Sequence, residues 1–293
     1  MERYIYSDLI FERENEELAA INDVSGRLIS DKKSFDIFRT HVDAKSDTGL
    51  PSGDYLTFIT DSLMFMTGNA LNELILCLSN ELRELVYKKL CNCIRSISVL
   101  IVGLGNPIIT ADSLGSETVK RITVSDAGSG DMKEKISVRI AAVSLGVPAL
   151  TGINTYDHVS GLINAFVPDV IIAVDSLAAR SSERLGRVIQ LSDCGISPGS
   201  GIGNGSVTLN EETLGIPVIS LGIPTVIRAS TMICDMLRRG GISVLSEDIC
   251  AAVNNNRSLF VSPKECDIII KSAADILSQS INIALDDIIR SSS

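Results

Sequence analysis

Two aspartates in this sequence directly follow apolar, β-branched runs, where a carboxylate could act as an acid or a base. Asp112 follows the run 98–104 and a Gly-Leu-Gly-Asn turn, and Asp175 closes the run 170–174. A carboxylate that ends so apolar a run loses solvation, and this loss raises its pKa. When two such carboxylates lie together, one of them holds a proton. The pair can then activate a water molecule and protonate a leaving amine.

Each aspartate also has a purely structural interpretation. Asp112 could be the N-cap of the next helix, and Asp175 could cap the turn that follows its strand. The chain has two histidines, so it offers few candidates for catalysis by a serine or cysteine nucleophile that a histidine activates. His158 could reach the same crevice as the aspartates, so a metal site formed by the three residues stays an alternative.

Two glycine-rich stretches of the sequence resemble anion-binding turns. The first, Gly-Leu-Gly-Asn-Pro-Ile, has Ile108 where a dinucleotide-binding turn needs its third glycine, and no lysine follows as in a phosphate-binding loop. The second, 197–206, could form an anion-binding nest or a surface loop. The residues predicted to line a substrate pocket come from these stretches and from the segment after Asp175: Asn106, Arg180, Ser197, Gly199, Ser200 and Gly201.

The elements that must position these residues alternate between short β-branched runs and segments of helical period. Strands are expected at 98–104, 136–143, 169–175, 188–192 and 216–221. Helices are expected at 69–94, 112–122, 155–166 and 225–239, with a long final helix from Ser262 to about Ile289. Continuous Val/Ile strands are typical of an α/β fold with a mostly parallel sheet and helices on both faces. At the carboxyl ends of such strands, side chains converge on one crevice.

The N-terminal part differs in character from the rest. Residues 1–60 are polar and mixed, with a short strand-like stretch at 55–60. We predict a processing segment and flap over 1–68, packed on an α/β catalytic body over 69–293, in one compact domain.

Bulk composition excludes several classes of function. The chain has 293 residues, 45% hydrophobic and 21% charged, with a net charge of -10. This is the composition of a folded globular protein, and its acidity with no basic stripe disfavours nucleic acid and anionic membranes as partners. Seven scattered cysteines and no signal peptide favour reduced thiols in the cytoplasm. Neither a metal nor a cofactor is predicted.

Several long motifs give the chain a resemblance to a known family. They occupy 103–115, 150–155, 168–184, 189–204, 214–226 and 262–267, and the stretch 6–12 adds a further likeness. In these segments the sequence resembles the germination proteases of spore-forming bacteria. The likeness runs in order over about 98–287.

The resemblance implies an endopeptidase that degrades small acid-soluble spore proteins in the spore core, with Asp112 and Asp175 as the catalytic pair. It also implies an inactive zymogen that cuts itself after an acidic residue, here between Asp8 and Leu9. A tetramer and a fold similar to that of hydrogenase-maturation endopeptidases are implied as well. A non-catalytic peptide-binding relative and a metal-sensing maturation protease of the hydrogenase type stay as alternatives.

The chain departs from the family pattern at several positions. Ser197 stands where the family usually has a histidine, Arg228 replaces a usual aspartate, and Pro107 replaces an aromatic residue. A long surface insertion typical of the family is missing between about Arg239 and Asn254. These departures concern substrate docking and zymogen control more than the chemistry of the two aspartates.

Overall fold

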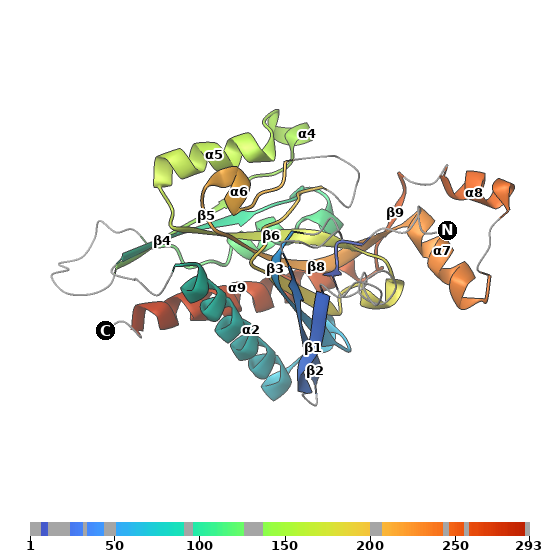
Figure 1. Cartoon of the computed structure of the whole chain (residues 1–293), viewed down its shortest axis with the longest axis horizontal. Helices are drawn as coiled ribbons and strands as arrows, with labels where there is room; N and C mark the ends of the chain where they lie inside the picture. The colour runs from blue at the N-terminus through green and yellow to red at the C-terminus, as the bar shows by residue number, and fades with distance from the viewer. Residues whose placement is uncertain are drawn as a thin grey trace.

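The structure of this chain is a computed structural model (Figure 1). It describes residues 7–10, 24–31, 34–43, 51–90, 96–125, 137–199, 207–242, 246–254 and 258–290. These residues form one nine-stranded sheet covered by helices. The strands are β1 (Val24–Asp31), β2 (Phe35–Val42), β3 (Gly53–Thr60), β4 (Ser96–Gly103), β5 (Ser137–Ser144), β6 (Val170–Ala179), β7 (Val188–Ser192), β8 (Val218–Arg228) and β9 (Phe260–Val261).

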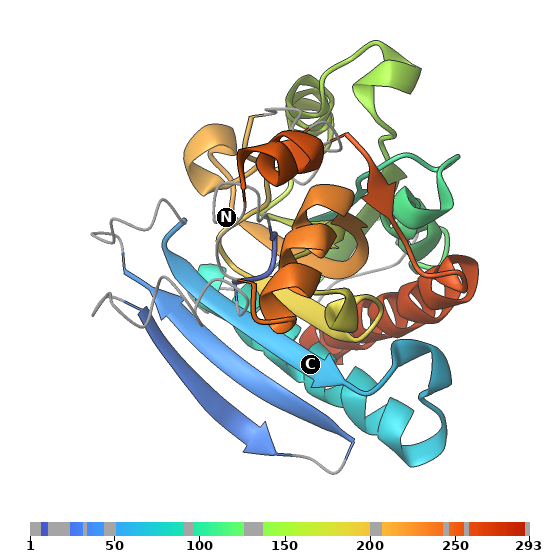
Figure 2. The ribbon, with the colours of Figure 1, turned by 90° about the vertical axis from the view of Figure 1, so that its right-hand side faces the viewer.

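The sheet is mixed. Its order is β1-β2-β3-β7-β8-β6-β4-β5, with β9 paired to β8. The pairs β4–β5, β4–β6 and β6–β8 are parallel, and the pairs that join β1, β2, β3, β7, β8 and β9 are antiparallel. Figure 2 shows the three N-terminal strands side by side along one edge of the molecule.

The expectation of an α/β fold is confirmed, but that of a mostly parallel sheet is wrong outside β5, β4, β6 and β8. The connections explain the difference. A parallel crossover needs a dozen or more residues, and the segment between Ala179 and Val188 is too short to provide one. The chain therefore turns back after β6, and β7 pairs antiparallel with β8.

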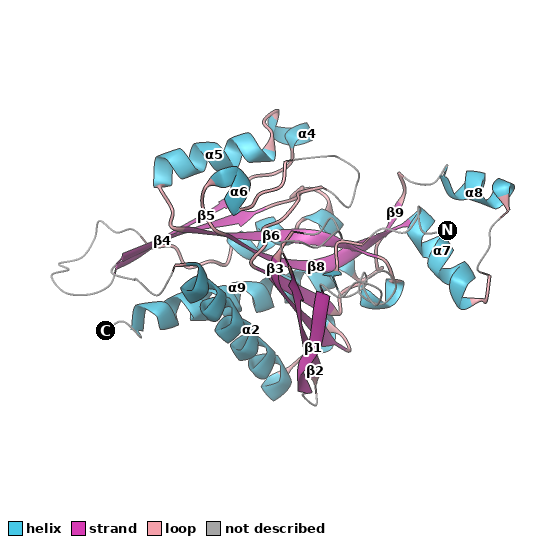
Figure 3. Ribbon diagram, viewed as in Figure 1, coloured by secondary structure: helices cyan, strands magenta, loops and turns pink. Residues whose placement is uncertain are grey.

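The helices are η3 (Leu63–Phe65), α2 (Gly68–Lys89), η4 (Thr110–Asp112), α3 (Leu114–Val119), α4 (Pro148–Thr151), α5 (Thr155–Phe166), η5 (Ser182–Arg184), α6 (Glu211–Leu214), α7 (Ala229–Arg239), α8 (Glu247–Asn254) and α9 (Cys266–Arg290). They cover both faces of the parallel strands, as the sequence predicts. One core cluster joins α2, α3 and α9 to the sheet, and a second joins α5 to the opposite face. Figure 3 shows α5 above the sheet, with α2 and α9 below it.

Apolar periodicity explains how α2 and α9 pack. In α2, Leu74, Leu78, Leu82 and Leu85 recur every three or four residues and are buried. Burial of each leucine contributes about 1.5–3 kcal/mol relative to exposure. In α9 the stretch Cys266–Ile289 is long and apolar enough to cross a membrane, but 61% of its most apolar window is buried inside the protein. Packing against α2 and the sheet accounts for its apolar character.

Most predicted elements are found, with shifted ends. The helix expected over 155–166 is α5, and the strand expected over 188–192 is β7, each with the same bounds. The helix expected over 225–239 is wrong in its first turn, because β8 continues to Arg228 before α7 begins. Buried Ile223 and Ile227 and the pairing with β6 and β9 keep this segment extended. The last helix begins at Cys266, later than the predicted cap at Ser262.

Candidate active site

The turn after β4 holds Asp112 at the carboxyl end of the parallel strands. The main-chain N–H of Leu104 donates to the carbonyl of Val174 (2.8 Å), and this bond fastens the start of the turn to β6. Gly105 has φ +91°, and a Cβ there would lie 2.8 Å from Oδ1 of Asp112. Only glycine lets the chain pass this close to the carboxylate.

Asp112 itself lies in the short helix η4, directly before α3. Its Oδ2 accepts a hydrogen bond from the main-chain N–H of Asn106 (2.8 Å). Burial raises the pKa of Asp112, and the bond from Asn106 partly opposes this rise. The N-cap of α3 is Ser113, and the Asp112 carboxylate instead bonds to the turn before it, so the capping interpretation does not hold.

Asp175 lies on β6 beyond the last residue that pairs with β4. Its side chain is buried, with the residue 6% exposed, and Oδ1 accepts from the main-chain N–H of Ser176 (2.8 Å). Burial raises the pKa of Asp175 well above its usual value of 3.8, and the charge of Asp112 raises it further, while the bond from Ser176 opposes the rise. The charge of Asp8 also adds to the increase.

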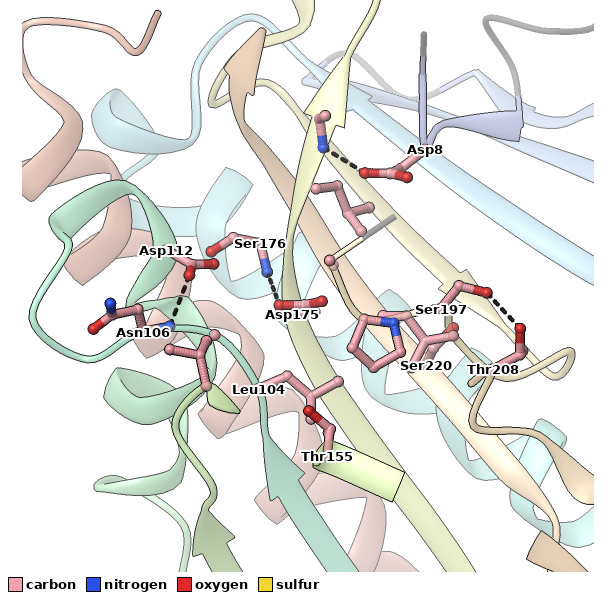
Figure 4. A pocket seen from close by; sticks show the side chains of 18 of the residues that line it. Asp8, Leu104, Asn106, Asp112, Thr155, Asp175, Ser176, Ser197, Thr208 and Ser220 are labelled. Carbon is pink, nitrogen blue, oxygen red and sulfur yellow. Dashed lines mark hydrogen bonds between the residues drawn. The ribbon is translucent and has the colours of Figure 1, made fainter. Parts of the chain in front are cut away.

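Both aspartates line one cavity of about 1040 Å³. Figure 4 shows Asp112 on the loop that follows β4 and Asp175 on β6. The charge of Asp112 disfavours the ionised form of Asp175 and so raises its pKa. Burial raises the pKa of both carboxyls, and the charge of Asp112 raises that of Asp175 further, so Asp175 is the member of the pair that more strongly favours its protonated form.

The other predicted pocket residues have different outcomes. Asn106, Ser197 and Gly199 line the cavity, and the hydroxyls of Ser197 and Thr208 lie 2.8 Å apart. Arg180, just past β6, is not among the residues that line it. Ser200 and Gly201 lie outside the described residues.

The N-terminal segment 7–10 also enters this cavity. Asp8 and Ile10 line the cavity, and Leu9 is 1% exposed in an apolar cluster with Leu177 and Val188. Figure 4 shows Asp8 bonded to a main-chain N–H of β6. The predicted processing bond and the predicted catalytic pair, far apart in the sequence, therefore share one cavity.

Ser176 and Gln190 are among the polar side chains of the cavity that sequence reasoning missed. The hydroxyl of Ser176 is buried and has no hydrogen-bond partner within the described chain. Gln190 bonds to the segment 7–10. Gln190 stands between Ile189 and Leu191 in a strand that reads as core, and a polar residue at such a position is the signal that could have revealed it.

Metal ligation by the aspartates with His158 has no geometric support. His158 is on α5 and is not among the residues that line the cavity. In the part of the chain that the structure describes, no group of three or more His, Cys, Asp or Glu side chains is arranged to hold a metal ion.

Comparison with known proteins identifies the family. The sequence pattern of germination proteases matches residues 6–239, most of the chain. The chain belongs to the germination protease family. It is therefore an endopeptidase, with a role in germination and a protein as its substrate.

Individual germination proteases are similar over nearly the whole length. That of Clostridium perfringens (strain SM101) is 34% identical over 280 residues, which cover 85% of each chain. That of Caldanaerobacter subterraneus subsp. tengcongensis is 34% identical over 269 residues, 81% of this chain and 79% of the relative. That of Clostridium acetobutylicum is 32% identical over an alignment that covers 90% of this chain and 89% of the relative.

Proposed function

We propose that this protein cleaves small acid-soluble spore proteins during germination and that Asp112 and Asp175 perform the hydrolysis. The observation that carries the proposal is the pair of carboxylates, buried Asp175 and half-buried Asp112, both with raised pKa, in one cavity that also holds a peptide segment of the chain. Peptide hydrolysis needs a base for water and an acid for the departing amine, and two carboxyls that share a proton supply both.

The two environments assign the roles. Asp112 is only half-buried and its pKa is raised less than that of Asp175, so it acts as the base that takes a proton from water. Asp175, whose pKa is raised well above its usual value, holds the proton that passes to the peptide nitrogen. The hydroxide adds to the carbonyl carbon, the C–N bond breaks, and a carboxylic acid and an amine leave. A proton then returns from Asp112 to Asp175.

The same proposal makes the bond between Asp8 and Leu9 the site of self-processing. Support comes from the burial of Leu9 and from the presence of Asp8 in the cavity with the catalytic pair. In this arrangement residues 1–68 form a processing segment and flap, and 69–293 form the catalytic body. While the segment 7–10 lies in the cavity, it blocks the entry of other peptides.

Further parts of the proposal rest on the family resemblance. They are a tetramer, a location in the cytoplasm of the spore core, and a fold shared with hydrogenase-maturation endopeptidases. Sedimentation analysis of the purified chain tests the first of these, with a tetramer expected and a monomer contradicting it.

The test of the reaction is incubation of the purified protein with a small acid-soluble spore protein, followed by mass analysis of the fragments. Asp112→Asn and Asp175→Asn are each expected to abolish cleavage. Asp169→Asn, at the other end of the Asp175 strand and bonded to the N–H of Ser98 (2.7 Å), is the matched control and is expected to cleave normally.

Two results would contradict the proposal. Cleavage by both variants at the wild-type rate would remove the aspartates from the mechanism. Binding of the spore protein by the wild-type chain without any cleavage would instead support a non-catalytic peptide-binding relative. For self-processing, a new N-terminus at Leu9 is expected, and a cut elsewhere would refute the assignment of that bond.

A further inference from the structure

The side chain of Gln190 contacts the main chain on both sides of the peptide bond between Asp8 and Leu9. Its Nε2 donates to the carbonyl oxygen of Asp8 (3.1 Å), and its Oε1 accepts from the main-chain N–H of Ile10 (2.8 Å). A carboxamide offers one donor edge and one acceptor edge, which match the C=O and N–H groups of an extended peptide. The carbonyl that it contacts belongs to the bond proposed to be cut.

The position of Gln190 on β7 explains why this side chain faces the segment. Successive strand residues point to opposite faces, and Ile189 and Leu191 pack into the core shared with α2 and α9. Gln190 points to the other face, where Val188 contacts the cluster around Leu9. There it is 9% exposed.

A polar side chain that is this buried needs hydrogen-bond partners. Both hydrogen bonds that the side chain of Gln190 makes within the described chain go to the segment 7–10. When that segment leaves, the carboxamide loses both partners. Another extended main chain in the same place would restore them, so the site is shaped for a second peptide as well as for the first.

Neighbouring groups hold the same segment at further points. The main-chain N–H of Asp8 donates to the carbonyl of Ala178 (2.9 Å), and the N–H of Ala178 donates to Oδ2 of Asp8 (2.8 Å). Leu9 fills an apolar pocket between Leu177 and Val188. These contacts fix the register of the segment, so that the carboxamide of Gln190 spans the bond between Asp8 and Leu9.

We propose that Gln190 is a substrate-binding residue that grips the main chain of a peptide across the bond to be cut. Its Nε2 donates to the carbonyl of the residue before the cut, and its Oε1 accepts from the main-chain N–H of the second residue after the cut. This inference rests on the proposed endopeptidase function and extends it to the peptide main chain: a substrate must present a free N–H two residues beyond the cut. Proline or an N-methylated residue at that position removes the acceptor contact.

Hydrogen exchange tests the grip without any need for cleavage. In full-length Asp175→Asn, the amide of Ile10 is expected to exchange slowly. Adding Gln190→Ala is expected to speed that exchange at least about 10-fold, because the hydrogen bond from the Ile10 amide is lost. Ser192→Ala is the matched control, because Ser192 lies on the same face of β7 and bonds to the N–H of Cys194 (3.0 Å). Equal exchange of the Ile10 amide with and without Gln190 would overturn the inference.

Peptide cleavage tests the same contact in substrate. The probes are a synthetic peptide with the sequence of residues 4–13 and the same peptide N-methylated at the residue that corresponds to Ile10. Gln190→Ala is expected to lower kcat/KM for the first peptide about 10-fold to 100-fold, from the loss of two hydrogen bonds, and to leave the pH profile in place. N-methylation is expected to slow the wild-type chain but to add no further loss in Gln190→Ala.

An equal loss on N-methylation in both chains would refute the contact. The two proposals fail separately. In one outcome the wild-type chain cuts neither its own segment nor the peptide, but Gln190→Ala still speeds hydrogen exchange of the Ile10 amide. The hydrolytic function is then refuted and the peptide-binding role of Gln190 is supported. If cleavage is normal and exchange does not depend on Gln190, the hydrolytic function stands and the grip fails.

Discussion

Replacement of Asp175 by asparagine is expected to abolish activity and to stabilise the fold at neutral pH. Asparagine has nearly the same shape, and its side-chain oxygen can still accept the bond from the N–H of Ser176. What it lacks is the negative charge, which burial and the charge of Asp112 disfavour in the folded state. A residue kept for stability would show the opposite result, so the two measurements together separate function from structure.

The size of each effect follows from the site. Removal of a positioned proton donor lowers the rate about 10²-fold to 10⁴-fold. For stability, each unit by which folding raises the pKa of Asp175 costs the wild-type protein about 1.4 kcal/mol at a pH above the folded pKa. In a chain of this size, each kcal/mol corresponds to about 2 °C in Tm.

The pH dependence has a fixed sign. Below the unfolded pKa, near 3.8, Asp175 is protonated in both states and the variant gains nothing. As pH rises from there, the unfolded chain loses the proton first, so the wild-type protein loses stability until the folded pKa is passed. The gain in Tm of Asp175→Asn therefore grows as the pH rises above about 4 and levels off once the folded pKa is passed.

Calorimetric unfolding across this pH range, with cleavage of a spore protein measured in parallel, checks both parts. Asp169→Asn serves again as the control, with normal cleavage expected. A Tm for Asp175→Asn below that of the wild type at pH 7 would refute the reasoning about the buried charge. Normal cleavage by the same variant would refute its role in the reaction.

Three further changes have expected outcomes. Gly105→Ala forces a Cβ against the Asp112 carboxylate, so cleavage is expected to fall about 10²-fold by displacement of a catalytic group, and an unchanged rate would contradict this. Leu9→Ala removes a buried side chain worth about 2–5 kcal/mol, so limited proteolysis is expected to cut the segment 7–10 at least about 10-fold faster, and equal rates would show that Leu9 does not anchor it. Lys88→Met removes the Lys88 bond to buried Asp193 (2.9 Å), so urea unfolding at pH 7 is expected to show a loss of about 1–3 kcal/mol, and a neutral result would mean that other groups compensate.

The sequence predicted that Asp112 and Asp175 lie in one crevice, and both line the same cavity. Asp112 and Asp175 each follow an apolar run, and β4 and β6 proved to be adjacent and parallel. Their carboxyl ends therefore meet at the same edge of the sheet. Continuous apolar runs indicate strands buried on both faces, and the carboxyl ends of such strands are where a crevice is expected.

Other features could not be read in this way. The reversal of β7 depends on the length of one connection, and the extension of β8 through Pro224 depends on its pairing with β6. The local sequence propensity of a segment does not encode such tertiary constraints. Arg180 follows Asp175 closely in the sequence but is not among the residues that line the cavity.

The sequence by itself determined the strands and helices with strong periodicity, the tight glycine turn before Asp112 and the two carboxylates at strand ends, since these depend on neighbouring residues. Only the tertiary structure decided that Gln190 contacts the main chain of Asp8 and Ile10 and that the N-terminal segment lies in the cavity with Asp112 and Asp175. Those contacts join residues about 180 positions apart through single side chains, and no local pattern encodes a pairing over such a distance.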